Sequence, residues 1–182
     1  ADDRPDAPGA HEGEVLAAPP EEGGDEVEDR HPDEEADEQV ERLREVGLEH
    51  FRIAFPAHPQ VAHHVEPGFN GIYLTRLFDG WVRDVVIDNA DSAILTEGIA
   101  NVTIERVTTL GKSLAHYSVQ LGGVHNVLVK DLRVENRVLH PLSFNTFANK
   151  SVYLDAFVRH DPLLDQHSGA NHQNLFDRTR VE

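Results

Sequence analysis

The sequence predicts an all-β fold, a parallel β-helix of about five coils, on three observations. First, four short segments share a pattern of one apolar residue, two mostly polar residues and another apolar residue, at spacings of 22, 25 and 25 residues. They begin at Val82, Ile104, Val129 and Leu154. Second, Ile94, Val119 and Phe144 form another apolar column with a spacing of 25 residues. Third, no amphipathic helix recurs within this period. A constant period of this length is typical of coils that bury their inward residues only when neighbours stack on them.

The N-terminal part of the chain differs in composition from the rest. Residues 1–32 combine Pro, Gly, Ala and acidic residues with almost no aromatic residue, so they cannot bury enough apolar surface to offset the entropy lost on ordering. We expect a disordered acidic leader there. In residues 33–46, Val40, Leu43 and Val46 recur at helical spacing among charged residues. This pattern predicts a short amphipathic helix that caps the first coil.

The predicted β-helix domain covers residues 47–182 and starts with an irregular coil. Its first strand copy begins at Leu48, 34 residues before Val82, and the excess is the Pro- and His-rich stretch 55–68. We expect this stretch to be a protruding loop with exposed histidines. The chain is short for a β-helix and does not begin with Met, so we expect a fragment of a longer solenoid.

The net charge of −17 is concentrated in the N-terminal quarter. Residues 1–44 hold 17 acidic and 4 basic residues, which leaves 16 acidic and 12 basic residues in the remainder. Binding to nucleic-acid phosphates requires a concentrated basic face, and the sequence pattern shows none. No apolar run is long enough to span a membrane. We therefore expect neither nucleic acid nor a membrane as a partner.

Four strings of the repeat region carry a family resemblance. They are VGLEHFRI (46–53), GWVRDVVIDNADSAI (80–94), IANVTIERVT (99–108) and HQNLFDRTRVE (172–182). With them the chain resembles the pectate-lyase-like right-handed parallel β-helix superfamily of bacterial carbohydrate-active and surface proteins. The resemblance covers roughly residues 45–182 and implies a right-handed solenoid, a polysaccharide partner and a secreted or cell-surface location. The Trp-Ile-Asp-His string of the best-known pectate lyases and a clear equivalent of their catalytic Arg are missing, so no catalytic residue carries over.

A row of imidazoles and carboxylates is the main candidate for a functional site. Asp91 and His116 each lie three residues before the second apolar column, and His140 lies one residue further out on the next coil. Asp165 and His167 follow on the last coil. Because neighbouring coils are about 4.8 Å apart, we expect these side chains to form a ladder on one face of the solenoid.

These residue types suit proton transfer on an acidic sugar. Histidine titrates near neutral pH, and a carboxylate beside it fixes its tautomer and raises its basicity. In a lyase, a base removes the proton α to the substrate carboxylate, an acid protonates the leaving oxygen, and a cation or amide neutralises the carboxylate. The candidate catalytic residues are His116, Tyr117, His140 and His167. The candidate substrate-binding residues are Asp91, Asn145, Asp165 and His172.

Other interpretations stay open at this point. The chain could be a non-catalytic carbohydrate-binding or surface adhesion module. A glycoside hydrolase would need two carboxyl groups at the sugar, and the available pair, Asp91 and Asp165, is three coils apart. The polar segment 165–174 is either a ligand-facing loop or a self-satisfied corner. Asn101, Asn126 and Asn149 are expected to form turn ladders.

The sequence predicts no cofactor and no metal ligand set. The absence of Cys excludes disulfides and thiolate zinc sites. His167 and His172 are five residues apart with Gly169 between them, which does not match the usual zinc spacing. A calcium ion stays open as a cofactor, but no motif supports it.

Overall fold

The structure, a computed structural model, describes residues 42–58 and 63–182. The expected leader and residues 33–41 of the expected capping helix lie outside the described residues. Residues 42–46 are described and include β1 (Leu43–Arg44), a short strand that pairs in parallel with β4 (Leu77–Phe78). Within the described residues, no helix is long and apolar enough to cross a membrane.

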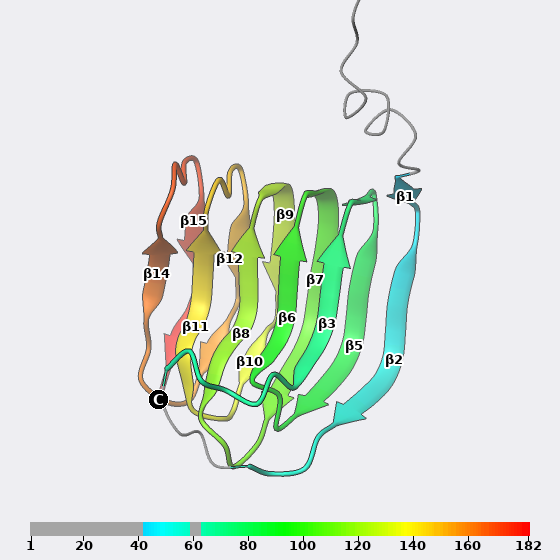
Figure 1. The fold of residues 1–182 in the computed structure, drawn as a ribbon. Coiled ribbons are helices and arrows are strands. Elements are labelled where there is room, and N and C mark those ends of the chain that lie inside the picture. Colours follow the sequence, from blue (N-terminus) through cyan, green and yellow to red (C-terminus); the bar gives the residue numbers. More distant parts are fainter. Residues whose placement is uncertain (1–41, 59–62) are drawn as a thin grey trace, which may run out of the picture. The chain divides into compact units, whose positions relative to one another are not determined.

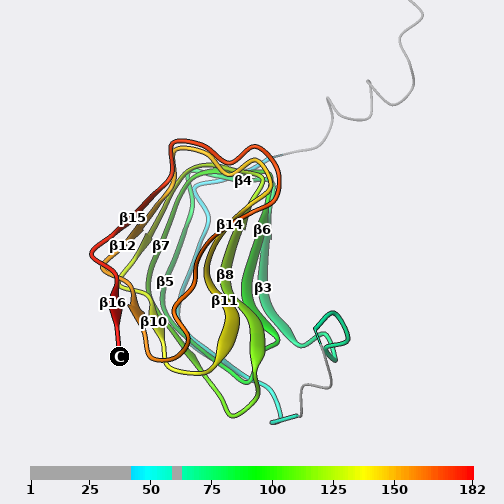
Figure 2. The same ribbon diagram turned by 90° about the vertical axis from the view of Figure 1, so that its left-hand side faces the viewer.

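The described chain is a parallel β-solenoid of about five turns, as the repeat predicts (Figure 1). A five-stranded sheet consists of β3 (Asn70–Thr75), β6 (Ser92–Glu97), β8 (Ala115–Gly122), β11 (Val138–Asn145) and β14 (Leu164–His167). An eleven-stranded sheet contains β1 and β4 together with β2 (Gly47–Ala54), β5 (Trp81–Asp88), β7 (Ile99–Leu110), β9 (Val124–Lys130), β10 (Arg133–Val134), β12 (Val152–Leu154), β13 (Phe157–Val158), β15 (Leu175–Asp177) and β16 (Arg180–Val181). Figure 2 looks along the stack, where successive coils overlay and the two sheets face each other across the core.

The first apolar column lies in the core in the predicted register. Leu48 pairs with Val82, Val82 with Ile104 and Ile104 with Val129. The side chains of Val82, Ile104 and Val129 are fully buried. The 34-residue spacing before Val82 therefore leaves the ladder intact, because the excess residues leave the coil after β2 ends.

The fourth member of this column differs from the prediction by one residue. Val129 pairs with Tyr153, not with Leu154, and Tyr153 pairs in turn with Phe176. Tyr153 is fully buried, and its hydroxyl donates to the carbonyl of Val119 at 2.8 Å. The pattern of two apolar residues three apart fits both registers here, so it could not separate them.

The second apolar column is displaced by two residues at its last member. Ile94 pairs with Val119 as predicted, but Val119 pairs with Leu142, and Phe144 pairs with Leu121. All five side chains are fully buried. A shift of two residues keeps the same face of a strand inward, which is why Phe144 still looked like a member of the column.

Two columns of left-handed residues form corners of the coils. Their members have φ between 50° and 61° and lie five residues apart in each coil. The first column is Glu45, Asp79, Asn101, Asn126, Lys150 and Gln173, and the second is His50, Asp84, Arg106, Asp131, Asp155 and Arg178. Positive φ is uncommon for residues other than Gly, with Asn and Asp the most tolerant. Twelve such residues in register show that the corners fix the path of the chain.

Polar side chains at these corners bond along the stack. Asn126 Nδ2 donates to Asn101 Oδ1 at 2.8 Å, and Asn101 Nδ2 donates to Asp79 Oδ1 at 2.9 Å. The expected ladder therefore joins Asn101 and Asn126. Asn149 lies one residue before Lys150, the member of the corner column in its coil, and accepts a hydrogen bond from His125 instead.

The corrected register can be tested by comparing Tyr153→Ala with Leu154→Ala. Removal of the buried Tyr153 ring should lower the free energy of unfolding by about 3–5 kcal/mol, because it leaves a cavity in the core. Leu154 is only half-buried, so its truncation should cost about 1 kcal/mol. Urea unfolding measures both, and a larger loss for Leu154→Ala would contradict this register.

Candidate functional site

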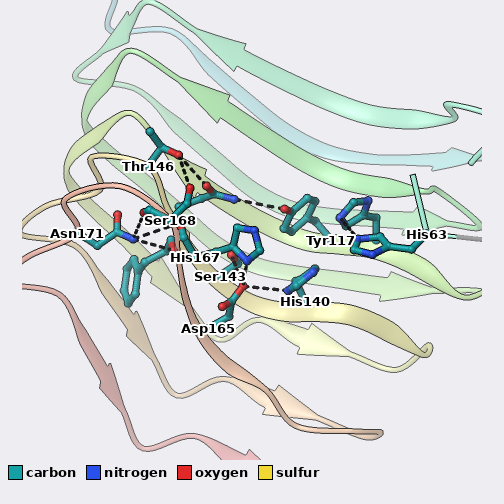
Figure 3. Close-up of polar contacts among 12 residues, drawn as sticks. His63, Tyr117, His140, Ser143, Thr146, Asp165, His167, Ser168 and Asn171 are labelled. Carbon is teal, nitrogen blue, oxygen red and sulfur yellow. Dashed lines mark hydrogen bonds and ion pairs between the residues drawn. The ribbon is translucent and has the colours of Figure 1, made fainter. Parts of the chain in front are cut away.

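The candidate site lies on the outer face of the five-stranded sheet, where β8, β11 and β14 run side by side (Figure 3). In β8, His116 and Tyr117 are consecutive and both half-buried, which breaks the usual alternation. The Asp91 carbonyl on the preceding coil accepts hydrogen bonds from the amides of both residues, at 2.6 and 3.3 Å. The register with the neighbouring strands stays one-to-one, with Ser92 and His140 both opposite Tyr117. Both side chains are therefore partly exposed without a shift of the ladder.

Four aromatic side chains form a row across the three strands. The ring centroids of His116 and Tyr117 are 4.3 Å apart, those of Tyr117 and His140 are 5.2 Å apart, and those of His140 and His167 are 5.1 Å apart. The three histidines expected to form a ladder therefore do lie together. His140 sits directly opposite Tyr117 in the parallel register, not one residue further out.

Asp165 on β14 joins the histidines of this row. Its Oδ2 lies 2.9 Å from Nδ1 of His140 and 3.4 Å from Nδ1 of His167, and it accepts a hydrogen bond from Ser143 Oγ at 3.1 Å. The contact with His140 is off the N–H direction, so among the described residues Nδ1 of His140 has an ionic neighbour but no hydrogen bond. The Asp165 carboxylate is 14% exposed, and Figure 3 shows it between Ser143 and His140.

The loop between β2 and β3 (the β2–β3 loop, residues 55–58 and 63–69 as described) is held against the sheet. Asp91 is 2% exposed and binds His58 Nε2 at 2.7 Å. Its other oxygen accepts hydrogen bonds from the amides of Gly68 and Phe69, both at 2.7 Å. Ser113 also bonds to the backbone of His58. The loop was expected to protrude with exposed histidines. His63 and His64 are exposed, but these contacts hold the loop against the sheet and largely bury His58.

The folded-back loop places His63 and Glu66 over His116. Nε2 of His63 lies 3.1 Å from Nε2 of His116, and Glu66 Oε1 lies 3.1 Å from Nδ1 of His116. The ring of His64 stacks on that of His63 at 3.8 Å. His63 is also near the row on β11, with its ring centroid 5.9 Å from that of His140.

Burial sets the protonation states of His116, Tyr117 and His140. Desolvation lowers the pKa of His116 and of His140, and it outweighs the attraction of Glu66 and Asp165 for the protonated rings. Desolvation also raises the pKa of Tyr117, and the negative charge of Asp165 adds to this shift. At neutral pH the two imidazoles are therefore uncharged and the phenol keeps its proton.

The structure brings six of the eight predicted site residues together. Asn145 joins the row because its Nδ2 lies 3.3 Å from the Tyr117 hydroxyl. Asp91 lies beneath the β2–β3 loop with its carboxylate fully engaged. His172 lies at a coil corner, where it forms a bridge with Asn149, and is not among the residues that contact the row.

The polar segment 165–174 combines both of its expected roles. Asp165 and His167 belong to β14 and face the site. Asn171 accepts a hydrogen bond from the amide of Ala148 at 3.0 Å, and Asn174 accepts one from the amide of Ser151 at 3.1 Å. The first part of the segment therefore faces the site, while the second closes a coil corner.

His63, Glu66 and Ser143 are the members of the site that the sequence did not single out as functional. Ser143 could have been found, because it lies two residues before Asn145 on the same strand. For His63 and Glu66 the available signal was a His-rich insertion in one coil. The path of this inserted loop over the sheet depends on the contact between His58 and Asp91, which no local sequence pattern encodes.

A hollow of about 470 Å³ lies away from this site, on the eleven-stranded sheet. Its lining includes Arg106, Asp155 and Arg178. Arg106 is paired with Asp84 through two hydrogen bonds of 2.7 and 2.9 Å, and Arg178 with Asp155 through two of 2.6 Å. These charges are satisfied within the protein, so the hollow offers less chemistry than the aromatic row.

Comparison of the chain with protein-family models, with curated proteins and with solved structures gives no match. Function must therefore be argued from the side chains of the site.

The anchor of the β2–β3 loop should weaken as the pH rises. The hydrogen bond to Asp91 raises the pKa of His58 above its usual value near 6.5, so the stabilisation is complete below about pH 6.5 and is lost as the pH rises through the raised pKa. At pH 6, His58→Ala should speed amide exchange at Gly68 and Phe69 about 10–100-fold, which corresponds to about 1.5–3 kcal/mol for a charged hydrogen bond.

The ratio of variant to wild-type exchange rates should be smaller at pH 9. His64→Ala, which leaves the contact with Asp91 intact, is the matched control and should leave both amides protected. Equal ratios at the two pH values would show that the charge of His58 does not hold the loop.

Proposed function

We propose that the chain is a polysaccharide lyase that cleaves an acidic polysaccharide by β-elimination on the outer face of the five-stranded sheet. One observation carries this proposal: a protonated tyrosine, an amide and a carboxylate-backed histidine lie on three neighbouring coils. They are Tyr117, Asn145 and the pair formed by His167 and Asp165. The resemblance to pectate-lyase-like right-handed β-helices supports the substrate class and a secreted or cell-surface location.

His167 is the proposed base. Its side chain is 47% exposed, so it can reach a substrate lying over the sheet. Asp165 lies on the Nδ1 side of the ring, which favours a proton on Nδ1 and leaves the lone pair on Nε2. Asn145 pairs with His167 in the parallel register, which places the amide one coil away from the base.

Tyr117 is the proposed acid. Its phenol keeps its proton because burial and the charge of Asp165 raise its pKa. Asn145 Nδ2 donates to the Tyr117 oxygen, which leaves the phenol proton free to point towards a leaving group. A donated hydrogen bond also stabilises the phenolate that forms when the proton leaves.

The elimination then proceeds with balanced proton transfers. His167 takes the proton from the carbon α to the sugar carboxylate, and the electron pair of that C–H bond forms a C=C bond. The C–O bond at the β carbon breaks, and its oxygen takes the proton of Tyr117. Water returns a proton to the phenolate and accepts one from the imidazolium. The products are an unsaturated uronate end and a chain with a free hydroxyl.

The glycoside hydrolase alternative has less support. It would require two carboxyl groups at one sugar. Asp91 is buried beneath the β2–β3 loop, and the two carboxylates at the row, Glu66 and Asp165, each face a histidine. A non-catalytic binding module would use the same face without proton transfer, and the assay below separates it from a lyase.

Tyr117→Phe and His167→Ala should each lower kcat by about 10²–10⁴-fold, the usual loss when a general acid or base is removed. Tyr117→Phe keeps the stacked ring, so KM should change little. The assay follows the ultraviolet absorbance of the unsaturated product on a panel of acidic and neutral polysaccharides. His160→Ala, an exposed histidine outside the row, is the control and should keep full activity.

Two results would count against a lyase. Full activity in both variants would remove the assigned acid and base. Polysaccharide binding without product from any substrate would identify a carbohydrate-binding module.

A further inference from the structure

We infer that His63, His116 and His140 bind a divalent transition-metal ion of the Zn²⁺ type. One ring nitrogen of each histidine lies within 4.8 Å of those of the other two. They come from three separate segments, namely the β2–β3 loop, β8 and β11. The site is thus assembled only when the loop folds back over the sheet.

The spacing of two of these nitrogens already approaches that of a metal centre. Nε2 of His63 and Nε2 of His116 are 3.1 Å apart. Two nitrogens bound to Zn²⁺ at 2.0–2.1 Å with a tetrahedral angle lie about 3.3–3.4 Å apart. A shift of a few tenths of an ångström would therefore let both lone pairs meet at one ion.

Carboxylates lie behind the two histidines of the sheet. Glu66 is 3.1 Å from Nδ1 of His116, and Asp165 is 2.9 Å from Nδ1 of His140. Metal-binding histidines almost always offer one ring nitrogen to the ion and the other to such a partner. In both cases the carboxylate is on the Nδ1 side, which leaves Nε2 for the ion. At His140 the carboxylate is an ionic neighbour, and Nδ1 has no hydrogen bond among the described residues. Both imidazoles are 13% exposed, so their orientation is fixed by packing.

The donor set selects the class of ion. Three imidazole nitrogens suit Zn²⁺, Cu²⁺, Ni²⁺ or Co²⁺, whereas Ca²⁺ and Mg²⁺ require oxygen ligands. Three protein ligands leave the fourth tetrahedral position open to water or a substrate. If the proposed lyase function holds, that position is where the substrate carboxylate would be neutralised, next to Tyr117 in the aromatic row.

A second group, His140, Asp165 and His167, also has ligand atoms within 4.8 Å of one another. Its shared oxygen, Asp165 Oδ2, already faces Ser143 Oγ and the Nδ1 atoms of both histidines. An ion there would displace these contacts. The group that includes His63 keeps them, and so it is the favoured site.

The test is calorimetric titration of the full chain with Zn²⁺, after chelator treatment and removal of any histidine tag. We expect one equivalent to bind, and Co²⁺ to give the strong visible absorption of a tetrahedral centre. Glu66→Gln should weaken binding about 10–100-fold, as expected for the partner of a metal-binding histidine. His63→Ala removes a ligand and should weaken binding more, while His160→Ala should leave it unchanged.

Two outcomes would overturn this assignment, namely no binding to the wild-type chain and unchanged affinity in His63→Ala. In the second case, loss of binding in His167→Ala would move the ion to the second group. Circular dichroism checks that each variant keeps the fold. Zn²⁺ binding without lyase activity would reject the proposed function alone, and lyase activity without Zn²⁺ binding would reject the metal site alone.

Discussion

The structure depends on the parallel hydrogen-bond ladder that holds each coil directly over the next. Inward residues such as Val82, Ile104 and Val129 are fully buried because each is covered by its counterparts on neighbouring coils. Left-handed residues repeat at two corners and fix where the chain bends. Residues at equivalent positions of successive coils therefore lie next to each other in the stack. Reactive side chains at such positions come together without any additional helix, strand or loop.

The candidate site follows from this constraint. Stacking sets Tyr117 opposite His140, and Asn145 opposite His167. His116 precedes Tyr117 in β8, is half-buried like it, and joins the row because the two rings stack. His116, Tyr117 and His140 are buried deeply enough for desolvation to shift their pKa values. The stacking of the coils therefore both positions these side chains and, by burying them, shifts their pKa values.

The repeat predicted the solenoid and most of the row, but it could not predict the exact register or the covering loop. Tyr153 and Leu154 both fit an apolar pattern, and only the left-handed Asp155, third in its segment like Asp131, distinguishes them. The sequence predicted that His116, His140 and His167 lie together, because they occupy similar positions in successive repeats. The position of His63 was not predicted, since the β2–β3 loop has no repeating partner and its path is set by a contact between residues 33 positions apart.

That loop shows that one coil can be longer than the others without a change in the ladder. The coil that carries it needs 34 residues to return to the same ladder position where the others need 22–25, yet Leu48 and Val82 remain paired. An insertion at this corner is thus compatible with the ladder while it alters what lies over the sheet. A different segment between β2 and β3 would keep the solenoid only if it also supplied hydrogen-bond donors to the buried carboxylate of Asp91.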